Sequence, residues 1–210
     1  MEFIRQASVN PLNAIRQNIR VIAQISTEEA FLATSGTYPY VTNELAYAQY
    51  RFDIQCPDKG CEDGSDEEFL EVYRSIRMLE DRHYHQQSDK VTHLDKYGRP
   101  CIRLRQFIFT PYTYSQQRMT RNDVVPPVPA CTWNVSPNMD EALASLEDTH
   151  KAHCLRAFDE NGFLMSPNEI AERLPGRNVE VVFKLLHCPT TANDADYGYL
   201  LAKPHSVVLL

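Results

Sequence analysis

Two cysteines and two histidines have the residue types and the spacing that could hold a metal ion. Cys56 and Cys61 enclose four residues, and His83 and His85 follow 22 and 24 positions after Cys61. Thiolate and imidazole groups are the ligands that tetrahedral zinc prefers. Most zinc motifs use a tighter cysteine spacing, so a zinc-free turn beside a solvated helix end is the alternative interpretation. Zinc at these four residues is the one cofactor that the sequence suggests.

A second candidate site combines arginines with aromatic residues between positions 96 and 121. This segment carries six basic residues and no acids, whereas residues 58–95 carry eleven acids and five bases, so the two local charges are +6 and −6. Guanidinium groups neutralise phosphates and aromatic rings stack on bases, so the segment could bind single-stranded nucleic acid. The candidate contact residues are Arg99, Arg103, Arg105, Phe107, Phe109, Tyr112, Tyr114, Arg118 and Arg121.

The same residues have a second interpretation as a protein interface. Arginine and tyrosine are enriched where proteins contact one another. The arginines could pair with the acids of 58–95, either within the fold or across a subunit contact. The net charge of −7 also argues against general affinity for a phosphate backbone, which favours the interface interpretation.

Residues 166–188 carry a short motif with two interpretations. Ser166 and Glu169 form a capping box, which predicts a helix over Pro167–Leu174. The letters IAERLPGRN resemble the corner of Myb and SANT domains, and that resemblance implies a DNA-recognition helix after Arg177. Apolar residues alternate in NVEVVFKLLH, however, and β-branched residues are frequent there. This pattern is typical of a buried strand and favours a helix followed by a strand.

Catalytic motifs are missing from the sequence. We find no nucleophile elbow, no Walker A loop, no glycine-rich dinucleotide turn and no HExxH. The chain has only seven glycines, which leaves little backbone for phosphate-cradling loops. The sequence therefore predicts a protein that is not an enzyme.

Periodicity and capping predict the elements that must position these candidate sites. Helical spacing or capping boxes predict helices at 10–24, 26–35, 65–82, 138–161 and 167–174. Alternation predicts strands at 46–56, 101–109 and 178–187, and short strands in YGYLLA and SVVLL. Proline and tyrosine over 110–137 indicate an extended arm. We therefore expect a single α+β domain over 1–210, with four to five helices and about five mostly antiparallel strands.

The bulk properties of the chain complete the functional interpretation. No apolar run approaches the roughly 18 residues of a membrane span, and no secretory signal is visible, which predicts a cytoplasmic or nuclear location or a place within a virion. We expect a non-enzymatic structural or assembly protein that self-associates, with a viral capsid or capsid-decorating subunit as an example. The alternative is a nucleic-acid-associated regulator that uses 96–121 or the Myb-like corner.

Overall fold

A computed structural model describes most of the chain. The described residues are 18–33, 36, 45–57, 64–84, 90–112, 128–135, 137–189 and 198–210. The strands are β1 (Asn18–Phe31), β2 (Gln49–Gln55), β3 (Thr92–Leu94), β4 (Pro100–Phe107), β5 (Phe109–Pro111), β6 (Val128–Pro129), β7 (His150–Ala152), β8 (Ala157–Phe158), β9 (Asn178–Pro189) and β10 (Gly198–Leu209). The α-helices are α3 (Ser65–His83), α5 (Asp140–Ala144) and α6 (Pro167–Arg173). Three short 3₁₀ helices are η1 (Leu45–Tyr47), η2 (Ala130–Thr132) and η3 (Pro137–Met139).

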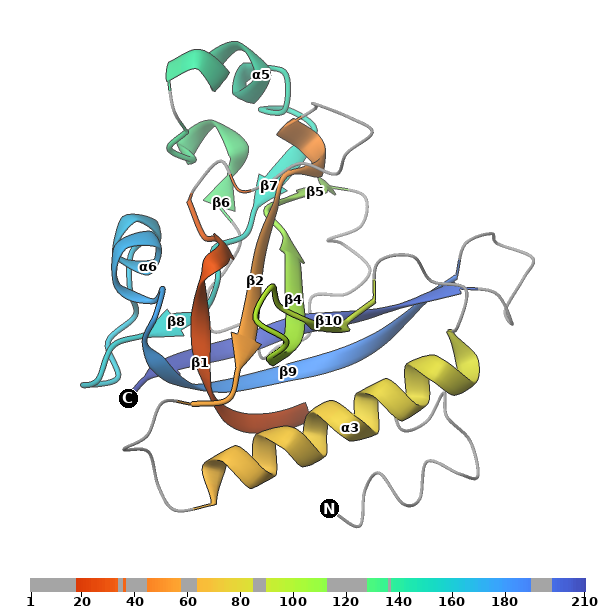
Figure 1. The fold of residues 1–210 in the computed structure, drawn as a ribbon. Coiled ribbons are helices and arrows are strands. Elements are labelled where there is room, and N and C mark those ends of the chain that lie inside the picture. The colour runs from red at the N-terminus through yellow and green to blue at the C-terminus, as the bar shows by residue number, and fades with distance from the viewer. Residues whose placement is uncertain are drawn as a thin grey trace.

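Five of the strands close into a barrel. The main sheet has the order β3-β4-β2-β1-β9-β10-β8, and β4 also pairs with β10. The closing contact is parallel and joins Ala202 to Leu104, whereas the other pairs around the barrel are antiparallel. The barrel strands therefore run β1-β2-β4-β10-β9 and back to β1. Figure 1 shows β9 and β10 as a long hairpin that crosses behind β2 and β4.

The barrel interior is filled by the alternating apolar residues of these strands. Tyr50, Phe52 and Ile54 of β2 are fully buried, as are Ile102 and Leu104 of β4. In β9 the inward residues are Val179, Val181 and Phe183, which the alternation of the sequence indicates. The predicted strands at 46–56, 101–109 and 178–187 are thus confirmed as β2, β4 with β5, and β9. The two predicted C-terminal strands form one strand, β10, with a register shift between Pro204 and Ser206.

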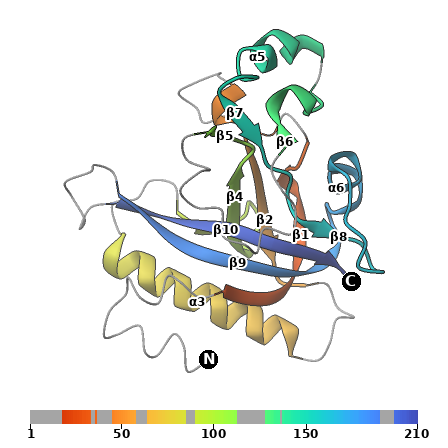
Figure 2. The ribbon, with the colours of Figure 1, turned by 180° about the vertical axis from the view of Figure 1, so that it is seen from behind.

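Helix α3 covers one end of the barrel, as Figures 1 and 2 both show. It buries Phe69, Tyr73 and Ile76 against the sheet, as its predicted apolar stripe requires. Ser65 and Glu68 have the spacing of a capping box, but no such box forms, because the residue before the helix is Gly64 in a left-handed conformation and no side chain caps the helix.

The opposite end of the barrel carries a small second layer. A three-stranded sheet of order β5-β7-β6 lies there, with α5 above it in both views (Figures 1 and 2). Phe109 of β5 packs edge-to-face on Trp133, with ring centroids 6.4 Å apart. α6 stands beside β8 and leads directly into β9 (Figure 1). Its capping box between Ser166 and Glu169 is present as predicted.

The predicted α+β class is wrong, because the described chain is mostly β, with ten strands and only three α-helices. The helix predicted at 10–24 is a strand from Asn18 onward, because β1 pairs along β9 from Asn18 to Gln24. The helix predicted at 26–35 is also wrong, since β1 continues through a bulge to Phe31. Residues 10–17 lie outside the described part of the chain.

The long helix predicted at 138–161 is wrong as well. Only Asp140–Ala144 is α-helical, and His150–Ala152 pairs with β5 and β6 instead. The predicted arm at 110–137 lies largely outside the described residues, and its ends contribute to β5, β6 and η2. Among the described residues, no helix combines the length and the apolar character needed to cross a membrane.

Candidate functional site

The outer surface of β2 and β4 is where charged and aromatic side chains meet. Arg51 of β2 lies opposite both Phe31 of β1 and Arg105 of β4 in the registers of the two pairs. Directly opposed residues point to the same side of a sheet. Because Phe52 and Leu104 point inward, Phe31, Arg51 and Arg105 form a row across three strands on the outside. We call this surface, together with Phe107, the β2–β4 face.

Exposed aromatic rings stand at two places on the face. Phe31 is 40% exposed and Phe107 is 42% exposed, which is unusual for large apolar side chains. The Arg51 guanidinium carbon lies 5.7 Å from the centroid of the Phe31 ring, within the range of a cation–π contact. The row extends to Tyr199 of β10, which lies near enough to Arg105 for its pKa to respond to the arginine charge. Burial raises the pKa of Tyr199, and the charge of Arg105 acts to lower it.

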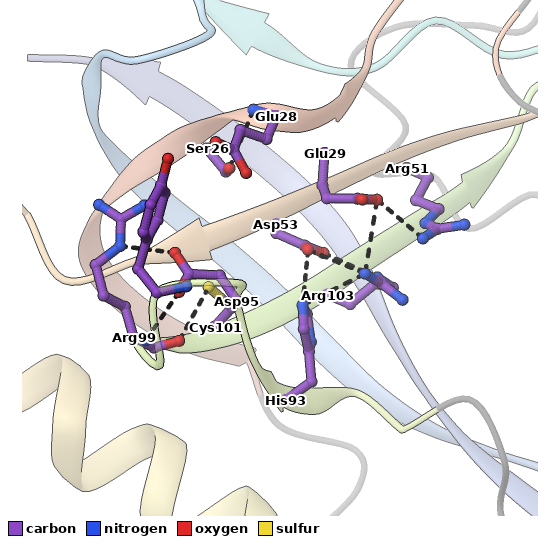
Figure 3. Close-up of polar contacts among 11 residues, drawn as sticks. Ser26, Glu28, Glu29, Arg51, Asp53, His93, Asp95, Arg99, Cys101 and Arg103 are labelled. Atoms are coloured by element: carbon purple, nitrogen blue, oxygen red, sulfur yellow. Dashed lines mark hydrogen bonds and ion pairs between the residues drawn. The ribbon is translucent and has the colours of Figure 1, made fainter.

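An ion-pair network lies beside this row (Figure 3). Arg103 Nε donates to Asp53 Oδ1 at 2.9 Å, and its Nη2 donates to Asp53 Oδ2 at 3.1 Å. His93 Nε2 lies 2.8 Å from Asp53 Oδ2 and is the donor, because a carboxylate only accepts. Asp53 and Arg103 are opposed across β2 and β4, so the register itself brings the pair together.

Asp53 is buried although it lies on the outer side of the barrel. Burial by itself would raise the pKa of Asp53, but the hydrogen bonds from His93 and Arg103 outweigh it and hold the pKa below its ordinary value. The carboxylate therefore stays charged at neutral pH and neutralises Arg103. Arg103 is thus a structural residue of the face.

Glu29 links the network to the row. Its Oε2 lies 3.0 Å from Arg51 Nη2 and 3.7 Å from Arg103 Nη2. Figure 3 shows the carboxylate between the two arginines. Glu29 belongs to the bulge of β1, where the pairing with β2 shifts between Ile25 and Ala30. A bulge re-aims side chains, and here it aims a carboxylate at the two guanidinium groups.

The structure brings together some of the sequence-predicted contact residues. Arg103, Arg105 and Phe107 lie on β4, and Arg99 lies just before it, paired with Asp95 at 2.6 Å. Phe109 is a buried residue of β5 in the second sheet, so it is not a surface residue. The ring of Tyr112 lies near Lys151, and the distance from the Lys151 Nζ to the Tyr112 ring centroid is 5.3 Å. Tyr114, Arg118 and Arg121 lie outside the described residues.

Sequence reasoning missed Phe31 and Glu29, since both fell in a predicted helix. Arg51 carried a signal, because the alternation of β2 places it opposite the buried residues. The prediction that the arginines pair within the fold holds for Arg99 and Arg103. The partner of Arg103, however, is Asp53 and not an acid of 58–95.

The structure does not bring the described metal candidates together. Burial and the negative charge of Asp66 raise the pKa of the Cys56 thiol, which places Cys56 near the start of α3. His83 is in the last turn of the same helix. Seventeen residues of helix separate Asp66 from His83, or about 25 Å at 1.5 Å per residue. Cys61 and His85 lie outside the described residues, and the described part of the chain contains no group of three metal-binding side chains.

The Myb-like corner is not a helix-turn-helix. α6 is followed by β9, a strand that pairs with both β1 and β10. The interpretation as a helix followed by a strand is confirmed, and the interpretation as a DNA-recognition helix is wrong.

The strand order defines the class of fold. Numbered along the chain, the five barrel strands follow the order 1-2-3-5-4 and return to 1, with a parallel contact between the third and the fifth. This is the arrangement of an OB-type barrel, a Greek-key barrel of five strands. In this chain β2 and β4 are the second and third strands.

Comparison with family models and with curated protein sequences gives no match. Solved structures do resemble the chain. One is gp2.5, a single-stranded DNA-binding protein encoded by bacteriophage T7, with a TM-score of 0.48 and 12% identity over 92% of this chain and 85% of that one. Another is the single-stranded DNA-binding protein of bacteriophage Enc34 in complex with ssDNA, with a TM-score of 0.48 and 14% identity over 92% and 85%. A C-terminal truncation of the Enc34 protein has a TM-score of 0.47 and 13% identity over 91% of this chain and 84% of that one.

These findings correct the functional interpretation of the sequence. The structural or assembly role, with a capsid subunit as its example, is wrong. The fold is a five-stranded OB-type barrel, and the three solved structures named above are single-stranded DNA-binding proteins. The prediction that the chain is not an enzyme stays a prediction.

Proposed function

We propose that this chain binds single-stranded nucleic acid on the β2–β4 face, with DNA as the ligand to test first. The observation that carries the proposal is the row of Phe31, Arg51 and Arg105 across three strands, with Phe107 beside it. OB-type barrels bind oligonucleotides on the face of their second and third strands, which are β2 and β4 here.

The residue types of the face fit a single strand better than a duplex. An exposed ring offers its face to an unpaired base, and stacking of this kind tolerates every base. Phe31 lies next to Arg51 across the strands and Phe107 lies next to Arg105 along β4, so bases could stack on the rings while the two arginines contact phosphates. A duplex hides its bases in the helix and would leave the rings unused.

The ion-pair network beside the row keeps the strands of the face in place. Asp53, Arg103 and His93 tie β2, β4 and β3 to one another by hydrogen bonds. A binding surface on strands whose side chains are fixed by neighbours loses little entropy when a ligand arrives. Arg103 therefore acts as a positioning residue.

The other predicted properties remain separate proposals. Self-association is a prediction from the opposed charge blocks, the Pro- and Tyr-rich arm and the apolar C-terminus, and light scattering of the purified protein tests it. An intracellular location follows from a role in nucleic-acid binding, and it is tested by fractionation of the cells that produce the protein.

Three variants test the proposal against the unmodified protein, with labelled oligothymidylate as the probe. We expect Phe107→Ala to weaken binding by about 5- to 150-fold, the range of a lost stacking contact of about 1–3 kcal/mol. We expect Arg105→Ala to weaken binding and to reduce the salt slope by about 0.7, because one phosphate contact is lost. Phe163→Ala serves as the control, because Phe163 is 71% exposed but lies in the turn after β8.

The outcome is read from fluorescence anisotropy at several salt concentrations. Equal affinities for Phe107→Ala, Arg105→Ala and the unmodified protein would contradict the proposed face. A loss of affinity in Phe163→Ala of the same size would do so too.

A further inference from the structure

The β3–β4 turn, residues 95–99, is a rigid platform for one aromatic ring. Asp95 Oδ1 accepts hydrogen bonds from the backbone N–H groups of Tyr97 at 2.8 Å and of Arg99 at 2.9 Å. The backbone closes the turn from Asp95 N to Arg99 O and from Gly98 N to Asp95 O, each at 3.0 Å. Gly98 has a φ of 78°, the left-handed conformation that glycine adopts without cost.

The chain builds the same turn a second time, over residues 159–163. Asp159 Oδ1 accepts from the N–H groups of Asn161 at 2.9 Å and of Phe163 at 2.8 Å. The backbone closes it in the same pattern, and Gly162 has a φ of 81°. The position of Tyr97 in the first turn is therefore the position of Asn161 in the second. The turn itself needs no aromatic residue there.

The side chain of Tyr97 is therefore not needed to form the turn. Its side chain is 66% exposed. The Lys96 Nζ lies 4.9 Å from the ring centroid and the Arg99 guanidinium carbon lies 5.3 Å from it. Two cations within this range hold the ring by cation–π contacts while leaving most of it open to solvent.

The charges around Tyr97 cancel. Lys96 pairs with Glu28 at 2.7 Å, and Arg99 pairs with Asp95 at 2.6 Å. Two bases and two acids leave no surplus charge for a phosphate. A ligand of this turn would therefore gain from stacking on the ring and not from neutralisation of its backbone.

The turn stands where β4 begins, at the far end of the strand from Phe107. β4 has 8 residues, so at about 3.3 Å per residue its two ends lie about 25 Å apart. Figure 3 shows Arg99, Asp95 and Cys101 at one end of the strand and Arg51 with Arg103 toward the other. A single strand that crosses the face and bends along β4 would reach Tyr97.

We propose that Tyr97 is a second base-stacking site, which lengthens the nucleic-acid site beyond the β2–β4 face. This inference rests on the proposed function. It makes a distinct claim, because the site would serve only ligands long enough to extend from Phe107 to the turn. Four nucleotides that keep the duplex spacing of about 3.4 Å extend about 14 Å, less than the roughly 25 Å between the two ends of β4.

The test compares two lengths of oligothymidylate, about 4 and about 16 nucleotides, which bracket the sites of OB-type barrels. The variant is Tyr97→Asn, since the turn at 159–163 shows that asparagine suits this position. We expect Tyr97→Asn to bind the long probe about 5- to 150-fold more weakly. The short probe should bind it as it binds the unmodified protein. The salt slope for the long probe should be unchanged, and Tyr97→Phe should retain the affinity because it keeps the ring.

A second readout detects stacking directly. Trp133 is the one tryptophan of the chain, and it is buried. In Tyr97→Trp the added indole is the exposed fluorophore. We expect the long probe to quench its fluorescence and the short probe to leave the fluorescence unchanged.

The outcomes separate the two proposals. If the unmodified protein binds neither probe, the proposed function fails and the second site fails with it. If the unmodified protein binds the long probe and Tyr97→Asn binds it equally well, without quenching in Tyr97→Trp, the second site is overturned and the proposed function stands. Equal weakening for both probe lengths would also overturn it, because the ring would then not act through length.

Discussion

Glu29 lies next to the β2–β4 face and is the described residue that opposes ligand binding there most directly. Its carboxylate contacts Arg51 and lies within 3.7 Å of Arg103, so it occupies the place that a phosphate would take. The Arg51 side chain is mostly buried, so the exposed part of its guanidinium group is shared between Glu29 and any ligand. The chain thus carries its own competitor for the phosphate on a bulge of β1.

Replacement of this carboxylate tests the competition. We expect Glu29→Gln to bind single-stranded DNA about 1.4- to 5-fold more tightly, because a partly exposed ion pair of about 0.2–1 kcal/mol no longer has to be broken. The salt slope should keep its value, because Arg51 contacts one phosphate with or without Glu29. Glu160→Gln is the matched control, because Glu160 pairs with Arg173 away from the face. Weaker binding by Glu29→Gln would show that Glu29 positions Arg51 instead of competing for it.

At this scale the sequence reveals residue types but not their partners. Arg103 and Arg105 are visible in the alternation of 101–109, and both point outward as that pattern requires. Nothing near Arg103 in the sequence indicates Asp53, which is 50 positions away. Pairing across strands depends on register, and register depends on the whole barrel.

At the scale of elements, α3 and β3 are joined by one carboxylate. Glu80 is fully buried. It accepts hydrogen bonds from Val91 N at 2.6 Å, from Thr92 N at 3.1 Å and from the Thr92 hydroxyl. Each of these donors would be buried without a partner if the carboxylate were removed. The helix that covers the barrel end is therefore attached to the edge strand through Glu80.

We expect Glu80→Ala to lower the free energy of unfolding by about 2–4 kcal/mol, the cost of leaving buried donors unsatisfied. The control is Glu71→Ala, because Glu71 is exposed in the middle of the same helix. Urea unfolding monitored by circular dichroism measures both. A loss in Glu80→Ala no larger than that in Glu71→Ala would contradict this account of the attachment.

Elements with a strong local signal could be predicted, and elements decided by distant pairing could not. α3, α6, β2, β4 and β9 were found because one periodicity dominates each. In β1 the apolar residues fit two periods, and Ile19 and Ile22 suggest a helix while Val21, Ala23 and Ile25 are the buried set. Pairing with β9 decides between them, as tertiary context overrides propensity. Around His150 the apolar residues recur at helical spacing, but the segment forms a strand that pairs with β5, again because tertiary context overrides the local pattern.

For the whole molecule, the average charge and the local charge point in different directions. The chain has a net charge of −7, which argues against nucleic acid. The β2–β4 face and its network place three arginines against two carboxylates, a local charge of +1, with exposed rings beside them. Binding depends on the field at the face more than on the average of the molecule. The overall acidity also disfavours contact of the remaining surface with the phosphate backbone.

The barrel itself is a property of the whole chain. Its closure joins β4 to β10 through one parallel contact, Ala202 with Leu104, nearly 100 positions apart. No local pattern encodes a contact of this kind, so the sequence indicated strands without their arrangement. The site has the same origin, because β1, β2 and β4 each contribute part of it.

The measurement that tests the central claim most directly is the salt dependence of binding to single-stranded DNA. Fluorescence anisotropy with labelled oligothymidylate would give the association constant of the unmodified protein over a range of salt concentrations. The account predicts saturable binding whose logarithmic slope is about −1.4, from two phosphates at about −0.7 each. No binding at low salt, or binding that salt does not weaken, would contradict the role of the β2–β4 face.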